Sequence, residues 1–306
     1  MRGASDRVDG GVAQKMRRLL FFAIFLFLAL SALGEEGYIR LQRDADGTPT
    51  ELQTAIARFV SEDGTVVDLI GIIHVGDKVY YQKMDRHLNN YESVLYEMVL
   101  DVPKSVSHQN DVRELLGREP EEPKIDTSKG GRDSVSRFQQ KLAEVLGLQY
   151  QLLNIDYTRT SFHHADLTAE EFRKAMLGKE ESPLEILKSL LEASRFEGPP
   201  EYEKLADLPL FSIITRGPTR QEQQTLKVGL GALLAESDVL ASEVQNEVVI
   251  GKRNERALEV LQKRMARGDK EFALLYGAAH MPDFSKRLRA LGFKPVSKSW
   301  TRAWDL

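Results

Sequence analysis

The chain has 306 residues, and its 42 basic and 46 acidic side chains leave a formal net charge of −4 at pH 7. The absence of a basic tract argues against a nucleic-acid partner. The absence of cysteine excludes a disulfide scaffold, a thiolate nucleophile and any cysteine-based zinc site.

Residues 1–34 have the layout of a secretory signal: basic residues, the apolar run Leu19–Leu30, and then small residues. Extended to Leu33, this run spans roughly 22 Å as a helix, less than the roughly 30 Å of a bilayer core. We therefore expect a cleaved leader and an exported protein, either periplasmic or extracellular. The alternative is an uncleaved membrane anchor at residues 19–33.

The first elements after the leader form a predicted strand–turn–strand–helix–strand series. Thr54–Val60 alternates in polarity, and Glu62–Gly64 is typical of a hairpin turn. Thr65–Ile73 is more continuously apolar, as a central strand is. Helical spacing of apolar residues predicts a helix over Asp77–Asn90, and Ser93–Val99 is a further apolar run. This order predicts a βαβ unit and a parallel sheet.

The middle of the chain is predicted to be largely helical. Residues 101–135 are rich in proline, glycine and charge, which favours a flexible surface insertion. Helices are expected over Phe138–Leu148 and Gln221–Leu240, with a strand at Tyr150–Tyr157 between them. A loop then leads into another helix, which the capping box of Thr168 and Glu171 opens.

A second strand and helix are predicted near the C-terminus. Phe272–Tyr276 is a buried strand, and the helix after it begins near Pro282 and ends at Gly292. The stretch "LLYGAAH" ending at His280 aligns without gaps with "DLIGIIH" ending at His74.

The predicted fold is therefore α/β. It has a mainly parallel central sheet with flanking helices, a duplicated strand–GxxH–helix unit and a helical middle insertion. It forms one domain over residues 35–306.

Three side chains are expected at one edge of this sheet. His74 and His280 each follow a predicted strand, and Glu97 lies at the end of the strand after the His74 helix. Ligands bind beyond the carboxyl ends of parallel strands. Two imidazoles and a carboxylate suit Zn²⁺, Mn²⁺, Co²⁺ or Fe²⁺ with open positions for water, where Glu97 would be a ligand or a general base. The alternative is two ordinary buried histidines and a solvent-facing carboxylate.

A further group of polar residues precedes the capping box. His163 and His164 are adjacent, so in an extended chain they point to opposite sides and at most one reaches the site. We consider His164 and Asp166 as additional metal ligands. The alternative is a local hydrogen-bond cluster.

Arg253 and Asn254 begin another predicted helix. Arg253 would stabilise an oxyanion or orient Glu97. The alternatives are a surface charge for Arg253 and a helix cap for Asn254.

Together these motifs resemble the TraB/PrgY/GumN/Tiki family, within a wider group that includes erythromycin esterases and ChaN-like haem-binding proteins. The resemblance covers most of residues 55–295. Its marks are two GxxH motifs, at His74 and His280, the glutamate at Glu97, and the pair Arg253-Asn254. It implies a metal-dependent hydrolase, most nearly a metalloprotease acting on peptides outside the cytoplasm. The alternatives are a non-catalytic protein that binds a peptide or a haem/iron ligand in the same cleft, and an esterase acting on a small molecule.

Overall fold

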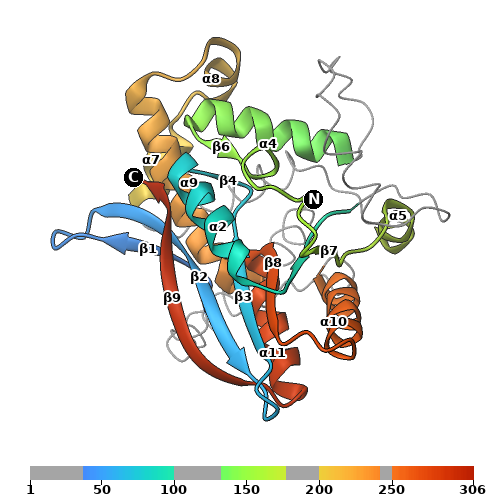
Figure 1. The fold of residues 1–306 in the computed structure, drawn as a ribbon. Helices are drawn as coiled ribbons and strands as arrows, with labels where there is room; N and C mark the ends of the chain where they lie inside the picture. Colours follow the sequence, from blue (N-terminus) through green and yellow to red (C-terminus); the bar gives the residue numbers. More distant parts are fainter. Residues whose placement is uncertain (1–36, 100–131, 177–199, 242–249) are drawn as a thin grey trace, which may run out of the picture. The chain divides into compact units, whose positions relative to one another are not determined.

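The computed structural model describes residues 37–99, 132–176, 200–241 and 250–306 (Figure 1). The predicted leader at 1–34 lies outside this part of the chain. So does the predicted insertion at 101–135, except for its last four residues, which begin a helix.

The sheet is mixed. Its strands, in spatial order, are β1 (Ile39–Arg43), β2 (Pro49–Val60), β3 (Val66–Ile72), β8 (Glu271–Gly277), β5 (Ser93–Tyr96) and β7 (Phe162–His164), with β9 (Lys294–Asp305) paired to β2. Strands β3, β8, β5 and β7 run parallel, whereas β1, β3 and β9 pair antiparallel with β2. A separate two-stranded sheet joins β4 (Val75–Gly76) to β6 (Gln149–Tyr150). The predicted α/β class with a parallel core is confirmed, and an antiparallel part adds to it.

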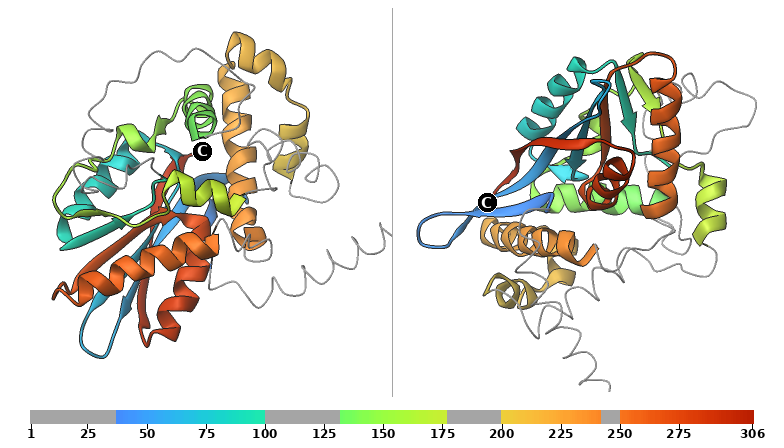
Figure 2. Two further views of the ribbon diagram at one scale, coloured as in Figure 1. Left: turned by 90° about the vertical axis from the view of Figure 1, so that its right-hand side faces the viewer. Right: turned by 90° about the horizontal axis from the view of Figure 1, so that it is seen from below.

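Helices cover both faces of the parallel strands. The helices are α2 (Lys78–His87), α4 (Arg132–Leu146), α5 (Ala169–Met176), α7 (Pro200–Ala206), α8 (Leu210–Arg216), α9 (Arg220–Ala241), α10 (Lys252–Met265) and α11 (Met281–Ala290). Short 3-10 turns are η1 (Leu88–Asn90), η2 (Gln151–Leu153) and η4 (Ala278–His280). Helix α2 lies on one face, and α10 and α11 lie on the other (Figure 2). Within the described ranges, none of the helices combines the length and apolar character needed to cross a bilayer.

Strand β8 lies between β3 and β5 in the sheet, although it comes much later in the chain than either of them. Ile72 of β3 pairs with Gly277, and Tyr96 of β5 pairs with Leu275. The connection through α2 therefore passes over β8. As a result, the carboxyl ends of three parallel strands lie side by side, with Gly277 in the middle.

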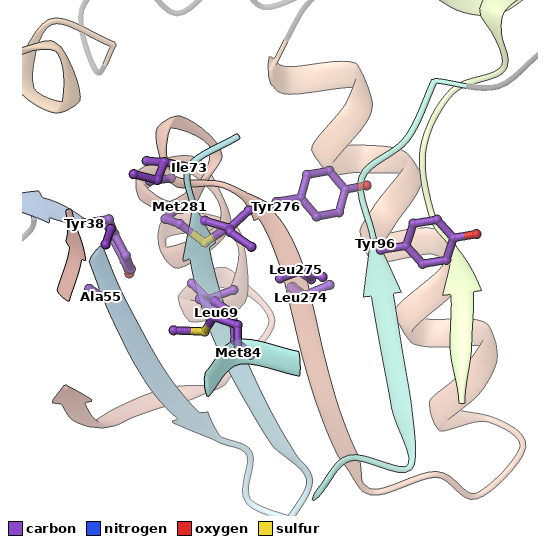
Figure 3. Close-up of a cluster of buried hydrophobic side chains, with 14 of the residues drawn as sticks. Tyr38, Ala55, Leu69, Ile73, Met84, Tyr96, Leu274, Leu275, Tyr276 and Met281 are labelled. Atoms are coloured by element: carbon purple, nitrogen blue, oxygen red, sulfur yellow. The ribbon is translucent and has the colours of Figure 1, made fainter. Parts of the chain in front are cut away.

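The apolar sequences of the central strands explain why they occupy this position. A parallel strand covered on both faces is apolar along its whole length rather than at alternate positions. Leu69 of β3 and Leu274 and Leu275 of β8 are at most 1% exposed and lie in one buried cluster (Figure 3). Tyr38–Leu306 forms one compact unit around this core.

Two local predictions are corrected. The strand predicted at Tyr150–Tyr157 is wrong, because only Tyr150 remains in a strand and the 3-10 turn η2 follows it. The loop predicted at His163 and His164 is also wrong, since both belong to β7, the neighbour of β5. A three-residue strand is too short to give a periodic signal.

Candidate metal centre

The side chains of His74, Glu97 and His280 converge on Gly277. His74 follows β3, Glu97 follows β5, and His280 ends the 3-10 turn η4 that follows β8. The parallel pairing of these strands brings the three positions to one edge of the sheet. His74 and His280 are more than 200 positions apart in the sequence, and they become neighbours because β8 pairs with β3 on one side and with β5 on the other.

Gly277 leaves the space into which these three side chains point. A Cβ atom at this residue would lie 3.3 Å from Oε2 of Glu97, 3.7 Å from Nε2 of His74 and 3.8 Å from Cδ2 of His280. The backbone of Gly277 has φ −50° and ψ 138°, which most residues can adopt. The glycine is therefore needed for space and not for its conformational freedom.

Glu97 is held by partners on both of its oxygens. Oε2 accepts a hydrogen bond from the amide of Gly277 at 2.6 Å, and Oε1 lies 2.7 Å from Nη2 of Arg253. Oε1 is also 3.6 Å from Nε2 of His280. Burial alone would raise the pKa of Glu97, but the Arg253 charge, the two histidines and the Gly277 amide outweigh burial and hold this pKa well below its usual range. The carboxylate is therefore ionised at neutral pH.

His280 is a buried, neutral imidazole. Burial lowers the pKa of His280 to about 4, although the nearby charge of Glu97 acts to raise it. Its Nδ1 atom lies 2.6 Å from Oδ1 of Asn254. At pH 7 no proton has to leave this ring before it binds a cation.

His74 is half-buried and has a comparable partner. Its Nδ1 atom lies 2.8 Å from Oε1 of Gln151, and its backbone carbonyl accepts a hydrogen bond from the Gln151 amide nitrogen at 2.9 Å. The Gln151 side chain in turn donates to the hydroxyl of Tyr157 at 2.7 Å. The side chain of His74 is thus supported from behind, while its Nε2 atom lies toward Gly277.

Arg253 is buried, so the interpretation of it as a surface charge is wrong. It bridges two carboxylates. Nε and Nη2 donate to the two oxygens of Asp166 at 2.9 and 2.5 Å, and Nη2 also contacts Glu97. Asp166 also accepts a hydrogen bond from the backbone amide of Leu167 at 2.7 Å. Both Asp166 oxygens therefore contact the guanidinium of Arg253, which in turn contacts Glu97. Asp166 thus helps to hold Arg253 in place beside Glu97.

His164 has different neighbours. Its Nε2 atom lies 2.5 Å from the carbonyl oxygen of Met98, which can only accept, so this nitrogen carries the proton. The ring packs edge-on against Tyr96. His163, on the next position of β7, has its pKa lowered to about 4, mainly by burial. Of the five predicted metal ligands, His74, Glu97 and His280 therefore lie together beside Gly277. His164 contacts the Met98 carbonyl instead, and Asp166 contacts Arg253.

Two further residues contact the histidines of this site, and the sequence did not indicate these contacts. Gln151 falls in the segment wrongly predicted as a strand, and for Asn254 the sequence indicates a helix cap and membership of the Arg253-Asn254 pair but no contact with His280. In the structure each contacts one of the two histidines that face Gly277. The only available signal was weak: an amide in an otherwise apolar buried segment requires a hydrogen-bond partner.

Across the described residues, no three histidine, aspartate or glutamate side chains are already close enough to form a ready metal-ligand set. A shared ion would therefore require His74, Glu97 and His280 to move toward it. Searches of protein-family models, curated proteins and solved structures found no match to this chain.

Proposed function

We propose that the chain is a metal-dependent hydrolase in which His74, Glu97 and His280 hold one divalent ion, Mn²⁺, Co²⁺, Zn²⁺ or Fe²⁺. Three protein ligands with an open position for water are typical of catalytic sites of this kind. The position at the carboxyl ends of parallel strands also agrees with where ligands bind in open α/β sheets.

One observation carries the proposal. An ionised carboxylate faces a neutral imidazole, with Glu97 Oε1 and His280 Nε2 3.6 Å apart. The Nε2 atom of a second histidine, His74, borders the same volume, 3.7 Å from the position of a Cβ atom at Gly277. A volume bordered by one negative charge and two imidazole rings suits a divalent cation better than it suits water or an apolar group.

The surroundings of Glu97 favour the role of ligand over that of general base. An efficient general base has a pKa near the working pH, whereas the pKa of Glu97 is held well below its usual range. Arg253 is assigned as the residue that positions Glu97, since it contacts this carboxylate and Asp166 at once. A divalent ion bound here would supply Lewis acidity, which polarises a carbonyl group and acidifies bound water.

We further propose that the two strand–GxxH–helix segments are a duplicated unit. One runs from β3 through His74 to α2, and the other from β8 through His280 to α11. The segment between β5 and α10 is then a helical middle insertion. This organisation and the residue set agree with kinship to the TraB/PrgY/GumN/Tiki family. The apolar leader supports export, and with it a peptide or small-molecule substrate outside the cytoplasm.

Metal content tests the proposal. The purified full chain, dialysed against trace metals and measured by mass spectrometry, is expected to carry about one divalent ion per chain. The double variant His74→Ala/His280→Ala should lose this ion. His87→Gln is the matched control, because His87 ends α2 and its Nε2 lies 2.8 Å from the Tyr91 hydroxyl. A ten-residue helix is roughly 15 Å long, so this substitution leaves the candidate centre untouched.

Catalysis is tested with a peptide library. Cleavage should require the ion, stop on chelation and be absent in the double variant. A stoichiometric metal without cleavage of peptides or esters would point to a non-catalytic binding protein. A haem absorption band in place of a divalent metal would favour haem binding, and cleavage that survives chelation would exclude metal catalysis.

A further inference from the structure

We infer that Gln151 and Asn254 are positioning residues that fix both histidines in one tautomer, with the proton on Nδ1 and a bare Nε2 on the side of Gly277. The meaning of this arrangement for catalysis rests on the proposed function. The arrangement itself can be measured in the metal-free chain.

The orientation of Asn254 follows from its other contacts. Its Nδ2 atom donates to the backbone carbonyl of His280 at 3.1 Å and to the Asp283 carboxylate at 2.8 Å. Both partners are acceptors, so they must face the amide NH₂ group. The Oδ1 atom is left to face Nδ1 of His280 at 2.6 Å, and it can only accept. The proton of the neutral ring is therefore on Nδ1, and Nε2 is bare.

Gln151 makes an equivalent arrangement at His74. Its Oε1 atom is 2.8 Å from Nδ1 of that ring, and its Nε2 group donates to the hydroxyl of Tyr157. Its backbone amide also donates to the carbonyl of His74, so one residue holds both the backbone and the ring. An acceptor at Nδ1 calls for the proton on Nδ1, and in the neutral form of the ring Nε2 then carries none.

The same solution is reached twice by unrelated parts of the chain. Gln151 begins the short turn η2, whereas Asn254 lies in the first turn of α10. Their exposed fractions are 4% and 0%. A buried amide is costly unless it is hydrogen-bonded, so an apolar residue would serve packing alone better. Hydrogen bonds from the outer nitrogen of a metal-bound histidine commonly fix its tautomer and orientation.

In this tautomer, His280 Nε2 and Glu97 Oε1, which lie 3.6 Å apart, cannot form a hydrogen bond with each other. Both atoms are then acceptors, and two facing acceptors repel each other unless a proton or a cation lies between them. The two amides thus favour a cation in the space beside Gly277 before any ion arrives. Without them, either ring could rotate or exchange its proton, and Nε2 could become a donor to the carboxylate.

Nitrogen-15 NMR of the imidazole rings in the metal-free full chain tests the inference directly. At pH 7 both rings should show a protonated Nδ1 and an unprotonated Nε2, the opposite of the tautomer that free histidine favours. The substitutions His74→Gln and His280→Gln assign the two sets of signals, because each removes one set. Observation of Nε2–H as the main form of either ring overturns the inference for that residue and its amide.

Two variants at Gln151 separate positioning from packing. Gln151→Met keeps the size of the side chain and removes the acceptor, whereas Gln151→Glu keeps an acceptor oxygen. In Gln151→Met the His74 ring should lose its tautomer preference, and Zn²⁺ affinity, measured by competition with a chromophoric chelator, should fall about 10- to 100-fold. Gln151→Glu should retain the tautomer and most of the affinity.

The outcomes distinguish the inference from the proposed function. If Gln151→Met folds and leaves both the tautomer and the Zn²⁺ affinity unchanged, Gln151 is not a positioning residue. If the wild-type rings show the expected tautomers but the chain binds no metal, the positioning inference stands and the proposed hydrolase fails. If Gln151→Met does not fold, the wild-type spectrum and Gln151→Glu still decide the question.

Discussion

The Nη2 atom of Arg253 lies 2.7 Å from the Oε1 atom of Glu97, and the two side chains are only 9% and 13% exposed. The same guanidinium binds Asp166, whose side chain is fully buried. The metal ion of the proposed site would therefore be held by the Glu97 carboxylate, whose own position depends on the buried guanidinium of Arg253.

Removal of the Arg253 guanidinium should strongly destabilise the fold. Arg253→Met leaves Glu97 and Asp166 buried without their partner, and breaking a buried ion pair in this way costs about 3–5 kcal/mol of the free energy of unfolding. Urea denaturation measures this loss. Arg256→Met on the same helix is the control, since Arg256 and its partner Glu171 are 32% and 42% exposed. That pair should contribute at most about 1 kcal/mol. Equal losses in the two variants would contradict the assigned role.

Gly277→Ala should weaken metal binding while leaving the fold intact. The backbone angles of Gly277 suit alanine, but the new Cβ would lie 3.3 Å from Glu97 Oε2 and would occupy the space between the ligands. Zn²⁺ affinity should fall by at least about tenfold, with a change in the free energy of unfolding below about 1 kcal/mol.

Gly231→Ala in α9 is the control for this substitution. The nearest atom to its new Cβ is 3.5 Å away, and alanine in a helix interior is expected to stabilise by up to about 1 kcal/mol. Its Zn²⁺ affinity should equal that of the wild type. An unchanged affinity in Gly277→Ala would mean that the ion, if any, binds elsewhere.

The stability of the metal-free chain should depend on pH through His280. Burial lowers the pKa of this ring from 6.5 to about 4, so between these values the unfolded chain binds a proton that the native chain does not. Stability therefore falls as the pH falls through this window, by about 3 kcal/mol in total for this group.

His280→Gln cannot take up this proton, so its stability should decrease less steeply between pH 6.5 and pH 4. Chemical denaturation at a series of pH values gives both slopes. His163, whose pKa is also lowered to about 4, contributes to the slope of both proteins. Identical slopes in wild type and variant would show that the pKa of His280 is the same in the native and unfolded chains, and so is not lowered by burial.

Leu274 tests the position of β8 at the centre of the core. It is fully buried on a strand that has parallel neighbours on both sides. Leu274→Ala should cost about 2–5 kcal/mol of the free energy of unfolding, from lost burial and from the cavity left behind. Leu153→Ala provides the comparison, because Leu153 is 70% exposed and its truncation should cost less than about 0.5 kcal/mol.

The central strands and the convergence of their ends could be predicted from sequence, because both follow from local patterns. Fully apolar runs indicated β3 and β8, and the residues after parallel strands lie at one edge. The position of β8 between β3 and β5 could not be predicted in this way, since it depends on pairing between distant segments. Strand β9 could not be predicted either, because its solvent-exposed residues far outnumber its buried ones and leave no apolar pattern.

The supporting residues of the site depend on tertiary contacts even more strongly. The sequence leaves Arg253 open between a surface charge and a partner of Glu97, and only its tertiary contacts with Asp166 and Glu97 exclude the surface charge. Gln151 lies in a stretch with strand-like composition that forms the turn η2, since its backbone amide bonds to the carbonyl of His74. The capping box of Thr168 and Glu171 was predictable because it is local, and its reciprocal hydrogen bonds are present.

The most direct test of the account is anomalous diffraction from crystals of the chain soaked in Zn²⁺, collected on both sides of the zinc absorption edge. We expect one strong peak next to Gly277, within about 2.0–2.2 Å of the Nε2 atoms of His74 and His280 and of a Glu97 oxygen. A map without a peak there would contradict the proposed metal site. A fully occupied Zn²⁺ peak elsewhere, with Nε2 of either histidine turned away from Glu97, would contradict it as well.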